Sequence, residues 1–186
     1  TTYMNKKIIL IDMDGVLADF ETGFLEAWQQ KFPKSHYIPL EKRKAFSVRN
    51  DYPKELEKDV ESIYRTPGFF QNLPEIAGGK EALTKMQELG NEVFICTSPI
   101  SKYENCVLEK YHWVSKNIGY EWTKRMIVAK DKTLVFGDIL IDDKPQHLGL
   151  KKPAWKHVFF DRPYNRNVKD KLRITWDNWE KILDFR

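Results

Sequence analysis

Short apolar runs recur along the chain at the length of a β-strand. The first lies in KIILIDM (7–13), and similar runs follow in EVFICTS (92–98), RMIVA (125–129), DILIDD (138–143) and HVFFD (157–161). A strand that is buried on both faces reads as a continuous apolar run, which is typical of a parallel sheet. These segments are therefore predicted to form such a sheet.

Helical patterns separate the later runs. The segment GGKEALTKMQELG (78–90) predicts a helix that stops at Gly90. Its apolar face is expected to hold Ala82, Leu83, Met86 and Leu89. The segment YENCVLEKYHWVSKNIG (103–119) predicts a second helix, whose apolar face is expected to hold Tyr103, Val107, Tyr111, Val114 and Ile118. Strands that alternate with helices indicate an α/β, Rossmann-like fold, a parallel sheet with helices on both faces.

A long insertion breaks this rhythm after the first strand. The interval from Ala18 to Gly79 is much longer than one crossover helix requires. It contains two helical stripes of apolar side chains, Phe20, Phe24, Trp28 and Phe32, then Leu56, Val60, Ile63 and Tyr64. We expect a helical cap domain at 18–79 and an α/β core domain made of 4–17 and 80–186. Residues 1–3 resemble a remnant of an expression vector and are left unassigned.

Composition narrows the class of protein. Of the 186 residues, 41% are hydrophobic and 31% are charged, which predicts a globular fold rather than a disordered chain. No window reaches the roughly 18 consecutive apolar residues of a membrane span, and no signal peptide is recognisable, so a cytoplasmic location without membrane contact is expected. The net charge of +4 is scattered, which argues against a nucleic-acid partner. Cys96 and Cys106 are expected to be reduced, structural thiols.

Polar residues end three of the apolar runs. Asp12 and Asp14 follow the first run, Thr97 and Ser98 end the second, and a later run ends in Asp142 and Asp143. Ligands of open parallel sheets bind outside the carboxyl ends of the strands, so these side chains are expected to share one site. A solvated or capped strand end is the alternative for any one of them, but three such ends favour a site.

The carboxylates predict a hard cation. A few oxygen ligands suit Mg²⁺ better than zinc, and the four histidines show no metal-ligand spacing. One aspartate could then attack a phosphorus atom while another acts as general acid and base. The phosphoryl oxygens would need donors, which Thr97 and Ser98 could supply if a helix begins directly after them. Lys110 and Lys132 are the candidate cations, with solvated surface lysines as the alternative.

The same motifs resemble a known enzyme superfamily. DMDGVLADF, ICTSP, a lysine in the following helix and LIDDKP are similar, in that order, to the haloacid dehalogenase (HAD) superfamily of aspartate-dependent phosphohydrolases. More closely, DMDGVLADFETGF, FICTSPI, EKYHWV and LIDDKP resemble the 5'(3')-deoxyribonucleotidases, and the similarity extends from Ile8 to WDNWEKIL near the C-terminus. This resemblance implies the HAD fold with a cap, magnesium, and a nucleoside monophosphate substrate of the dUMP or dTMP type. A homodimer is also expected by resemblance.

The resemblance also implies a role for individual residues. Asp12 matches the nucleophile, and Asp14 matches the acid and base, with its backbone carbonyl as a metal ligand. Asp142 and Asp143 match the remaining metal-site carboxylates, and the sequence does not decide which of the two binds the metal directly. The phosphate-binding positions are Thr97, Ser98, Lys110 and Lys132. The substrate-binding positions of the cap are Phe20, Phe46, Ser47, Val48 and Tyr64.

Two alternatives stay open. Ser47 and Tyr64 stand where animal relatives carry tryptophans, so the site could instead accept other small phosphate esters, such as sugar phosphates. A non-catalytic nucleotide-binding module is the other alternative, although such a module would be expected to lose Asp12 or Asp14. The aromatic residues of the cap could also belong to its core rather than to a substrate pocket.

Overall fold

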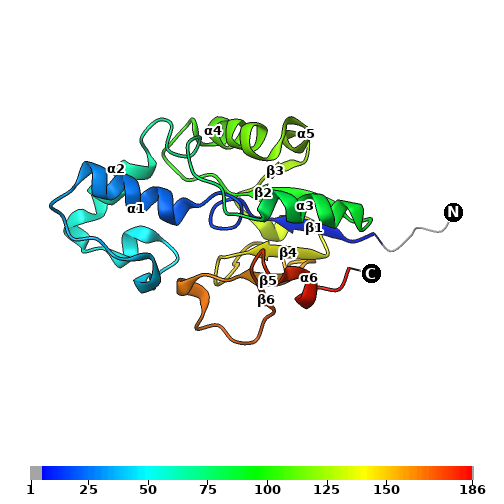
Figure 1. Cartoon of the computed structure of the whole chain (residues 1–186). Helices are drawn as coiled ribbons and strands as arrows, with labels where there is room; N and C mark the ends of the chain where they lie inside the picture. The colour runs from blue at the N-terminus through cyan, green and yellow to red at the C-terminus, as the bar shows by residue number, and fades with distance from the viewer. Residues whose placement is uncertain (1–5, 186) are drawn as a thin grey trace.

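Six parallel strands form one sheet in the part of the chain that the computed structural model describes, residues 6–185 (Figure 1). They are β1 (Ile8–Ile11), β2 (Glu92–Thr97), β3 (Met126–Val128), β4 (Ile139–Asp142), β5 (Lys156–Phe160) and β6 (Arg173–Ile174). Each predicted strand is confirmed, whereas β6 was not predicted because two residues make no recognisable pattern. Residues 1–3 and the expected start of the core domain at residue 4 lie outside the described residues.

The strand order places the polar strand ends together. The order is β3-β2-β1-β4-β5-β6, so β1 lies between β2 and β4. Ile11, the last residue of β1, pairs with Ile95 of β2 and with Ile141 of β4. The chain order reverses direction at β1, which is the position where parallel sheets of this kind bind ligands.

The α-helices are α1 (Phe20–Lys31), α2 (Glu57–Tyr64), α3 (Gly79–Glu88), α4 (Cys106–Trp113), α5 (Tyr120–Thr123) and α6 (Trp179–Ile182). The shorter turns are the 3-10 helices η1 (Leu40–Lys42), η2 (Val48–Asp51), η3 (Lys54–Leu56), η5 (Lys132–Leu134) and η6 (Pro163–Asn165), and the π-helix η4 (Val114–Ile118). In α3 the predicted face is buried at Ala82, Leu83 and Met86, and Gly90 follows with a left-handed φ of 90°. Leu89 was predicted wrongly, because it follows the last helical residue and is exposed.

The predicted face of α4 is also wrong in part. Val107 and Tyr111 are exposed, whereas Cys106, Lys110 and Trp113 are buried. The buried face carries a lysine, and a hydrophobicity pattern assigns every lysine to the surface. The later positions of this segment, Val114 and Ile118, are buried as predicted, and Tyr103 packs against the core.

The two faces of the sheet are covered differently. One face, with Ile9 and Ile11, belongs to a large apolar cluster that includes buried residues of α1 to α6. The other face, with Leu10, Cys96 and Leu140, packs on Trp155 and Val135, which lie outside the α-helices. Right-handed crossovers place the connections after β3 and β4 on this second face, and within residues 6–185 those connections contain only η5. The predicted α/β fold, a parallel sheet flanked by helices, is thus confirmed, and the α-helices within residues 6–185 belong to the cluster on the first face.

The insertion after β1 contributes α1 and α2. Figure 1 shows α1 and α2 together on the left, beyond the sheet, whereas the chain termini lie on the right. Both predicted stripes are confirmed, since Phe24 and Trp28 of α1 and Val60 and Ile63 of α2 are buried. Cys96 and Cys106 are free and buried, as expected. No helix among the described residues combines the length and apolar character that a membrane span needs.

Candidate active site

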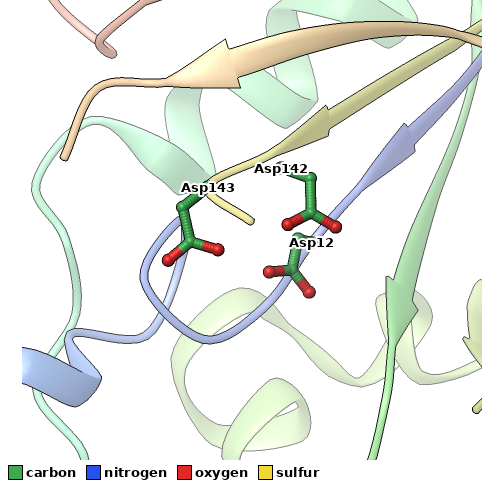
Figure 2. A group of neighbouring side chains, drawn as sticks. All are labelled: Asp12, Asp142 and Asp143. Carbon is green, nitrogen blue, oxygen red and sulfur yellow. The ribbon is translucent and has the colours of Figure 1, made fainter. Parts of the chain in front are cut away.

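Three carboxylates meet at the ends of β1 and β4. Asp12 follows β1, Asp142 ends β4, and the backbone N–H of Asp12 donates to the carbonyl of Ile141 at 2.9 Å. Oxygens of Asp12, Asp142 and Asp143 lie within 4.8 Å of one another, and all three residues are buried. Figure 2 shows their carboxylates pointing toward one another. The pairing of β1 with β4 thus brings together residues that are 130 positions apart in the chain.

Lys132 provides the nearest positive charge. It lies in η5, and its Nζ donates to Asp12 Oδ1 and to Asp142 Oδ2, each at 2.7 Å. Burial would lower the pKa of Lys132, but the two carboxylates raise it above its ordinary value, so the ammonium stays charged. Burial would raise the pKa of Asp142, but Lys132 and His147 hold it below its usual range. For Asp12, burial and the Asp142 charge prevail and raise the pKa to about 6.

Asp143 is buried and hydrogen-bonded to Tyr164. The Tyr164 hydroxyl donates to Asp143 Oδ2, while Oδ1 of Asp143 is buried without a hydrogen-bond partner among the described residues. Burial, and then the charges of Asp12 and Asp142, raise the pKa of Asp143 well above its ordinary value. A Cβ at Gly15 would overlap Asp143 Oδ2, and Gly15 has a φ of 81°, so glycine is required at this turn on two counts.

Asp14 lies on the turn after β1 and is paired with Lys110. Nζ of Lys110 donates to Asp14 Oδ2 at 2.5 Å, and the lysine side chain is fully buried. The other Asp14 oxygen, Oδ1, has no hydrogen-bond partner in the described structure. A buried lysine is held here by a carboxylate, so the alternative of a solvated surface lysine is wrong for Lys110, and likewise for Lys132.

The hydroxyl residues after β2 differ in position. Ser98 lines the cavity described below, and its Oγ donates to the carbonyl of Ala129 at 2.6 Å. Thr97 is buried in the strand and does not line the cavity. The expected helix N-terminus directly after Ser98 is absent, because Pro99 begins a loop and α4 starts only at Cys106. A phosphate at Ser98 would therefore meet loop amides rather than a helix terminus.

A cavity of about 370 Å³ opens above the carboxylates. Every residue predicted for the site lines it except Thr97 and Lys110. The lining residues from the strand ends and η5 are Asp12, Asp14, Asp142, Asp143, Ser98 and Lys132, and those from the insertion include Phe20, Phe46, Ser47, Val48 and Tyr64. Phe20 packs among aromatic rings, with its ring centroid 6.0 Å from Tyr64 and 5.5 Å from Phe69, so these side chains belong both to the core of the insertion and to the cavity wall.

Several residues at the site were missed by sequence reasoning. Tyr164 and His147 line the cavity, and His147 Nε2 lies 3.3 Å from Asp142 Oδ2. His157 Nε2 lies 3.1 Å from the carbonyl of Asp142. One signal could have revealed Tyr164, because β5 is parallel to its neighbours and the residues after it return to the same edge of the sheet. The cavity wall also includes Glu21, Arg49, Arg65, Lys130 and Lys144.

The carboxylate cluster fits a metal site. Two of the three buried carboxylates, Asp12 and Asp142, share one lysine, the pKa values of Asp12 and Asp143 are raised, and Asp143 Oδ1 is unpartnered among the described residues. A bound cation would favour the ionised form of every carboxyl group in this cluster. Oxygen-only donors suit a hard cation. Chemically, the arrangement offers a carboxylate nucleophile, a second carboxyl group for proton transfer and, in Lys132, a cation that can meet a phosphate.

Solved structures share this fold. A HAD-family structure from Bacillus subtilis, bound to magnesium, matches with a TM-score of 0.61 over 97% of this chain and 100% of that chain, at 12% sequence identity. A HAD family hydrolase from Deinococcus radiodurans, with bound phosphate and sodium, matches with a TM-score of 0.59 over 93% of each chain, at 13% identity. At these identities the similarity establishes the fold, which is the HAD fold.

Relatives by sequence are much closer. The human 5'(3')-deoxyribonucleotidase of the cytosolic type is 43% identical over 96% of this chain and 94% of its own. A Bordetella pertussis protein with the provisional name 5'(3')-deoxyribonucleotidase is 47% identical over 95% of both chains. The family model of the 5' nucleotidase, deoxy (pyrimidine), cytosolic type C proteins matches residues 6–186. The chain therefore belongs to this 5'-nucleotidase family, a group of phosphoric monoester hydrolases with the HAD fold.

Proposed function

We propose that this protein is a magnesium-dependent 5'(3')-deoxyribonucleotidase that hydrolyses deoxyribonucleoside monophosphates of the dUMP or dTMP type to nucleoside and phosphate. The observation that carries the proposal is the union of two features in one cavity. Four aspartates and Lys132 line it, and so do the aromatic side chains of Phe20, Phe46 and Tyr64. The names of the relatives point to the same activity.

We propose that Asp12 is the nucleophile. An oxygen of Asp12 attacks the phosphorus atom, the bond from phosphorus to the nucleoside oxygen breaks, and an aspartyl phosphate forms. The nucleophile must be ionised, and Lys132 at 2.7 Å from Asp12 Oδ1 favours that form. Ser98 and Lys132 line the same cavity as Asp12, where the lysine would offset the charge of the phosphoryl oxygens and the serine hydroxyl would hydrogen-bond to them.

Asp14 is the proposed general acid and base. It gives a proton to the departing nucleoside oxygen and then takes a proton from the water that attacks the aspartyl phosphate, which releases phosphate and regenerates Asp12. Its position supports this role, because Asp14 lines the cavity next to Asp12 and is held in place by Lys110. Lys110 thereby acts through Asp14 and not on the phosphate itself.

Magnesium is the proposed cofactor. The side chains of Asp12, Asp142 and Asp143 would hold it, together with the backbone carbonyl of Asp14. When bound, it supplies positive charge that offsets repulsion between the carboxylates and a phosphate dianion. Isothermal titration calorimetry of the purified protein should detect Mg²⁺ binding, and Asp143→Asn should weaken it by roughly 10-fold or more. Unchanged affinity in that variant would exclude Asp143 from the site.

We also propose a separate role for each of the two domains. Residues 18–79 act as the cap that recognises the nucleoside, and residues 4–17 and 80–186 act as the catalytic core. The contacts of Phe20, Phe46 and Tyr64 with the cavity support this assignment. A cytoplasmic location and a homodimer are further parts of the proposal, and a relative named as the cytosolic type supports the location.

A phosphate-release assay tests the function. With Mg²⁺ present, dUMP and dTMP should be hydrolysed, and Asp12→Asn should lower kcat/KM by roughly 10³-fold or more. The matched control is Asp170→Asn, an exposed aspartate that should leave activity unchanged. Phosphate release that survives in Asp12→Asn would contradict the mechanism.

Ser47 favours a second candidate function. Its short polar side chain lines the cavity beside Arg49 and Arg65, so the wall is more polar there than at Phe20. The same assay with sugar phosphates distinguishes the two candidates. Turnover of sugar phosphates equal to or faster than that of dUMP would support a broader phosphatase.

A further inference from the structure

A buried arginine lies behind the nucleoside end of the cavity. Arg43 follows η1, and its side chain is only 3% exposed. Nε of Arg43 donates to Asp51 Oδ2 at 2.6 Å, and Nη1 pairs with Glu21 Oε2. Both carboxylate side chains are less than a tenth exposed. A buried charge is costly unless every group around it is well paired. The positions of Arg43, Glu21 and Asp51 are therefore tightly constrained.

The hydrogen bonds of this network hold together the two ends of one segment of the cavity wall. Nη2 of Arg43 donates to the carbonyl of Ala45 at 2.9 Å and lies 3.4 Å from that of Phe46. Asp51 accepts from the backbone N–H of Lys44 at 3.1 Å and of Ala45 at 3.0 Å. Arg43 and Asp51 therefore join the two ends of the segment 43–51, which contains four consecutive residues of the cavity wall, 46–49.

The same guanidinium connects this segment to two other parts of the site. Glu21 directly follows Phe20 in α1, so the Arg43–Glu21 pair links the segment to the part of the cavity wall that holds Phe20. The Arg43 guanidinium also lies 5.4 Å from the ring centroid of Tyr164, the residue that donates to Asp143. The rings of Phe46 and Tyr164 meet edge to face, with centroids 5.8 Å apart.

We infer that Arg43 is a positioning residue for nucleoside recognition: it fixes the wall segment 43–51 against Phe20 and Tyr164, and so determines how well the cavity holds the base. The inference rests on the proposed function. The planar guanidinium donates from three separate nitrogens, to Glu21, Asp51 and a backbone carbonyl, and a lysine, whose donors all lie on one nitrogen, cannot reproduce that fork. Arg43 itself is absent from the cavity lining, so its effect on substrate must pass through the wall.

Two substrates separate positioning from general damage. Arg43→Lys should raise KM for dUMP by roughly 10-fold or more while kcat changes less than about 3-fold, because the lost interactions bind substrate in the ground and transition states alike. Deoxyribose 5-phosphate has no base, so its kcat/KM should change by less than about 2-fold. The matched control is Arg125→Lys, since Arg125 pairs with Glu92 at 2.9 Å at the amino end of β2. That control should leave both substrates unaffected.

Other outcomes would overturn the inference. An equal loss with both substrates would show that Arg43 supports the whole fold or the carboxylates, and no loss with dUMP would show that it positions nothing. If Arg43→Lys fails to fold, Glu21→Gln removes one charge of the network while it keeps the side chain's shape, and it should raise KM for dUMP selectively by roughly 3-fold or more.

A binding measurement keeps the inference independent of turnover. If the wild-type protein hydrolyses neither substrate, the proposed function fails. Calorimetric binding of deoxyuridine to the wild type and to Arg43→Lys then still reports on Arg43. A Kd that rises by roughly 10-fold supports the inference, and equal Kd values contradict it.

Discussion

The two ends of the cavity are built by different means. At the floor, formed by Asp12, Asp14, Asp142, Asp143 and Lys132, the lysine bonds directly to Asp12 and Asp142, and the pairing of β1 with β4 brings these two aspartates together. At the wall, formed by residues 43–51 with Phe20 and Tyr64, a loop carries the lining residues. That loop is held by backbone hydrogen bonds to two buried side chains, Arg43 and Asp51.

This difference separates the groups proposed to carry out the reaction from the groups proposed to select the substrate. Sheet register fixes the floor, so the reacting groups keep their geometry whatever occupies the wall. The wall depends on one guanidinium and its two carboxylates, Glu21 and Asp51, neither of which is a carboxylate of the floor. Damage to the floor should therefore impair every phosphate ester equally, whereas damage to the wall should impair only nucleotides.

The largest effect is expected from Lys132→Met. This change leaves Asp12 and Asp142 buried without their shared cation. The value of kcat/KM should fall by roughly 10³-fold, equally for dUMP and deoxyribose 5-phosphate. The free energy of unfolding should fall by about 3–5 kcal/mol, and Mg²⁺ should restore part of it. Denaturant titration measures the stability, with the exposed Lys169→Met as control. A loss confined to dUMP would contradict the separation of floor and wall.

Lys110→Met should have the next largest effect. It removes the donor that holds Asp14 at 2.5 Å, so the proposed proton transfer to the leaving group should be misaligned. The value of kcat/KM for dUMP should fall by roughly 10²-fold. An activated ester such as 4-nitrophenyl phosphate, whose leaving group needs little protonation, should lose less than about 10-fold. Equal losses for the two esters would show that Lys110 serves the phosphate rather than Asp14.

The sequence predicted the floor better than the wall for a physical reason. Apolar runs such as Ile8–Ile11 identify buried strands, and the polar residues that end such strands must meet at one edge of the sheet. Asp12, Asp142 and Asp143 were therefore recognisable and are brought together by the structure. The resemblance to a family added the cap positions, all of which line the cavity.

Buried charges explain most of what the sequence did not reveal. Arg43 stands in the segment EKRKAF, where it looks like any solvated cation, yet it is 4% exposed. Lys110 likewise lies on the buried face of α4, whereas Val107 and Tyr111, which were predicted to be buried, are exposed. Such residues are buried because distant partners neutralise them, Glu21 for Arg43 and Asp14 for Lys110. Those partners are far away in the chain, so local periodicity contains no trace of them.

Tyr164→Phe should have a smaller effect on the floor. The variant keeps the ring beside Phe46 and Arg43 but removes the hydroxyl that donates to Asp143. The value of kcat/KM should fall by roughly 10-fold through weaker Mg²⁺ affinity, with KM for dUMP little changed because the ring stays in place. Calorimetric Mg²⁺ titration and steady-state kinetics measure the two quantities. Selective loss of dUMP binding would place Tyr164 in the wall instead of the floor.

The smallest effect is expected from His157, which lies beneath the floor. Burial lowers the pKa of His157 to about 4, below the 6.5 of an exposed histidine. The unfolded chain therefore takes up the proton first, so this stability is present above about pH 6.5 and is lost as the pH falls toward 4. Between about pH 7.5 and about pH 5.5 the loss should be about 1 kcal/mol.

A variant isolates that contribution of His157. The raised pKa of Asp12 changes stability with pH in the opposite direction, so the total pH dependence of the wild type is not the readout. Denaturant titrations at both pH values should show that His157→Gln loses less stability on acidification than the wild type, by about 1 kcal/mol. His36→Gln, a change at an exposed position, should behave like the wild type. His157 contacts the floor through the carbonyl of Asp142. If His157→Gln and His36→Gln lose the same stability on acidification, acid does not weaken the molecule at the floor.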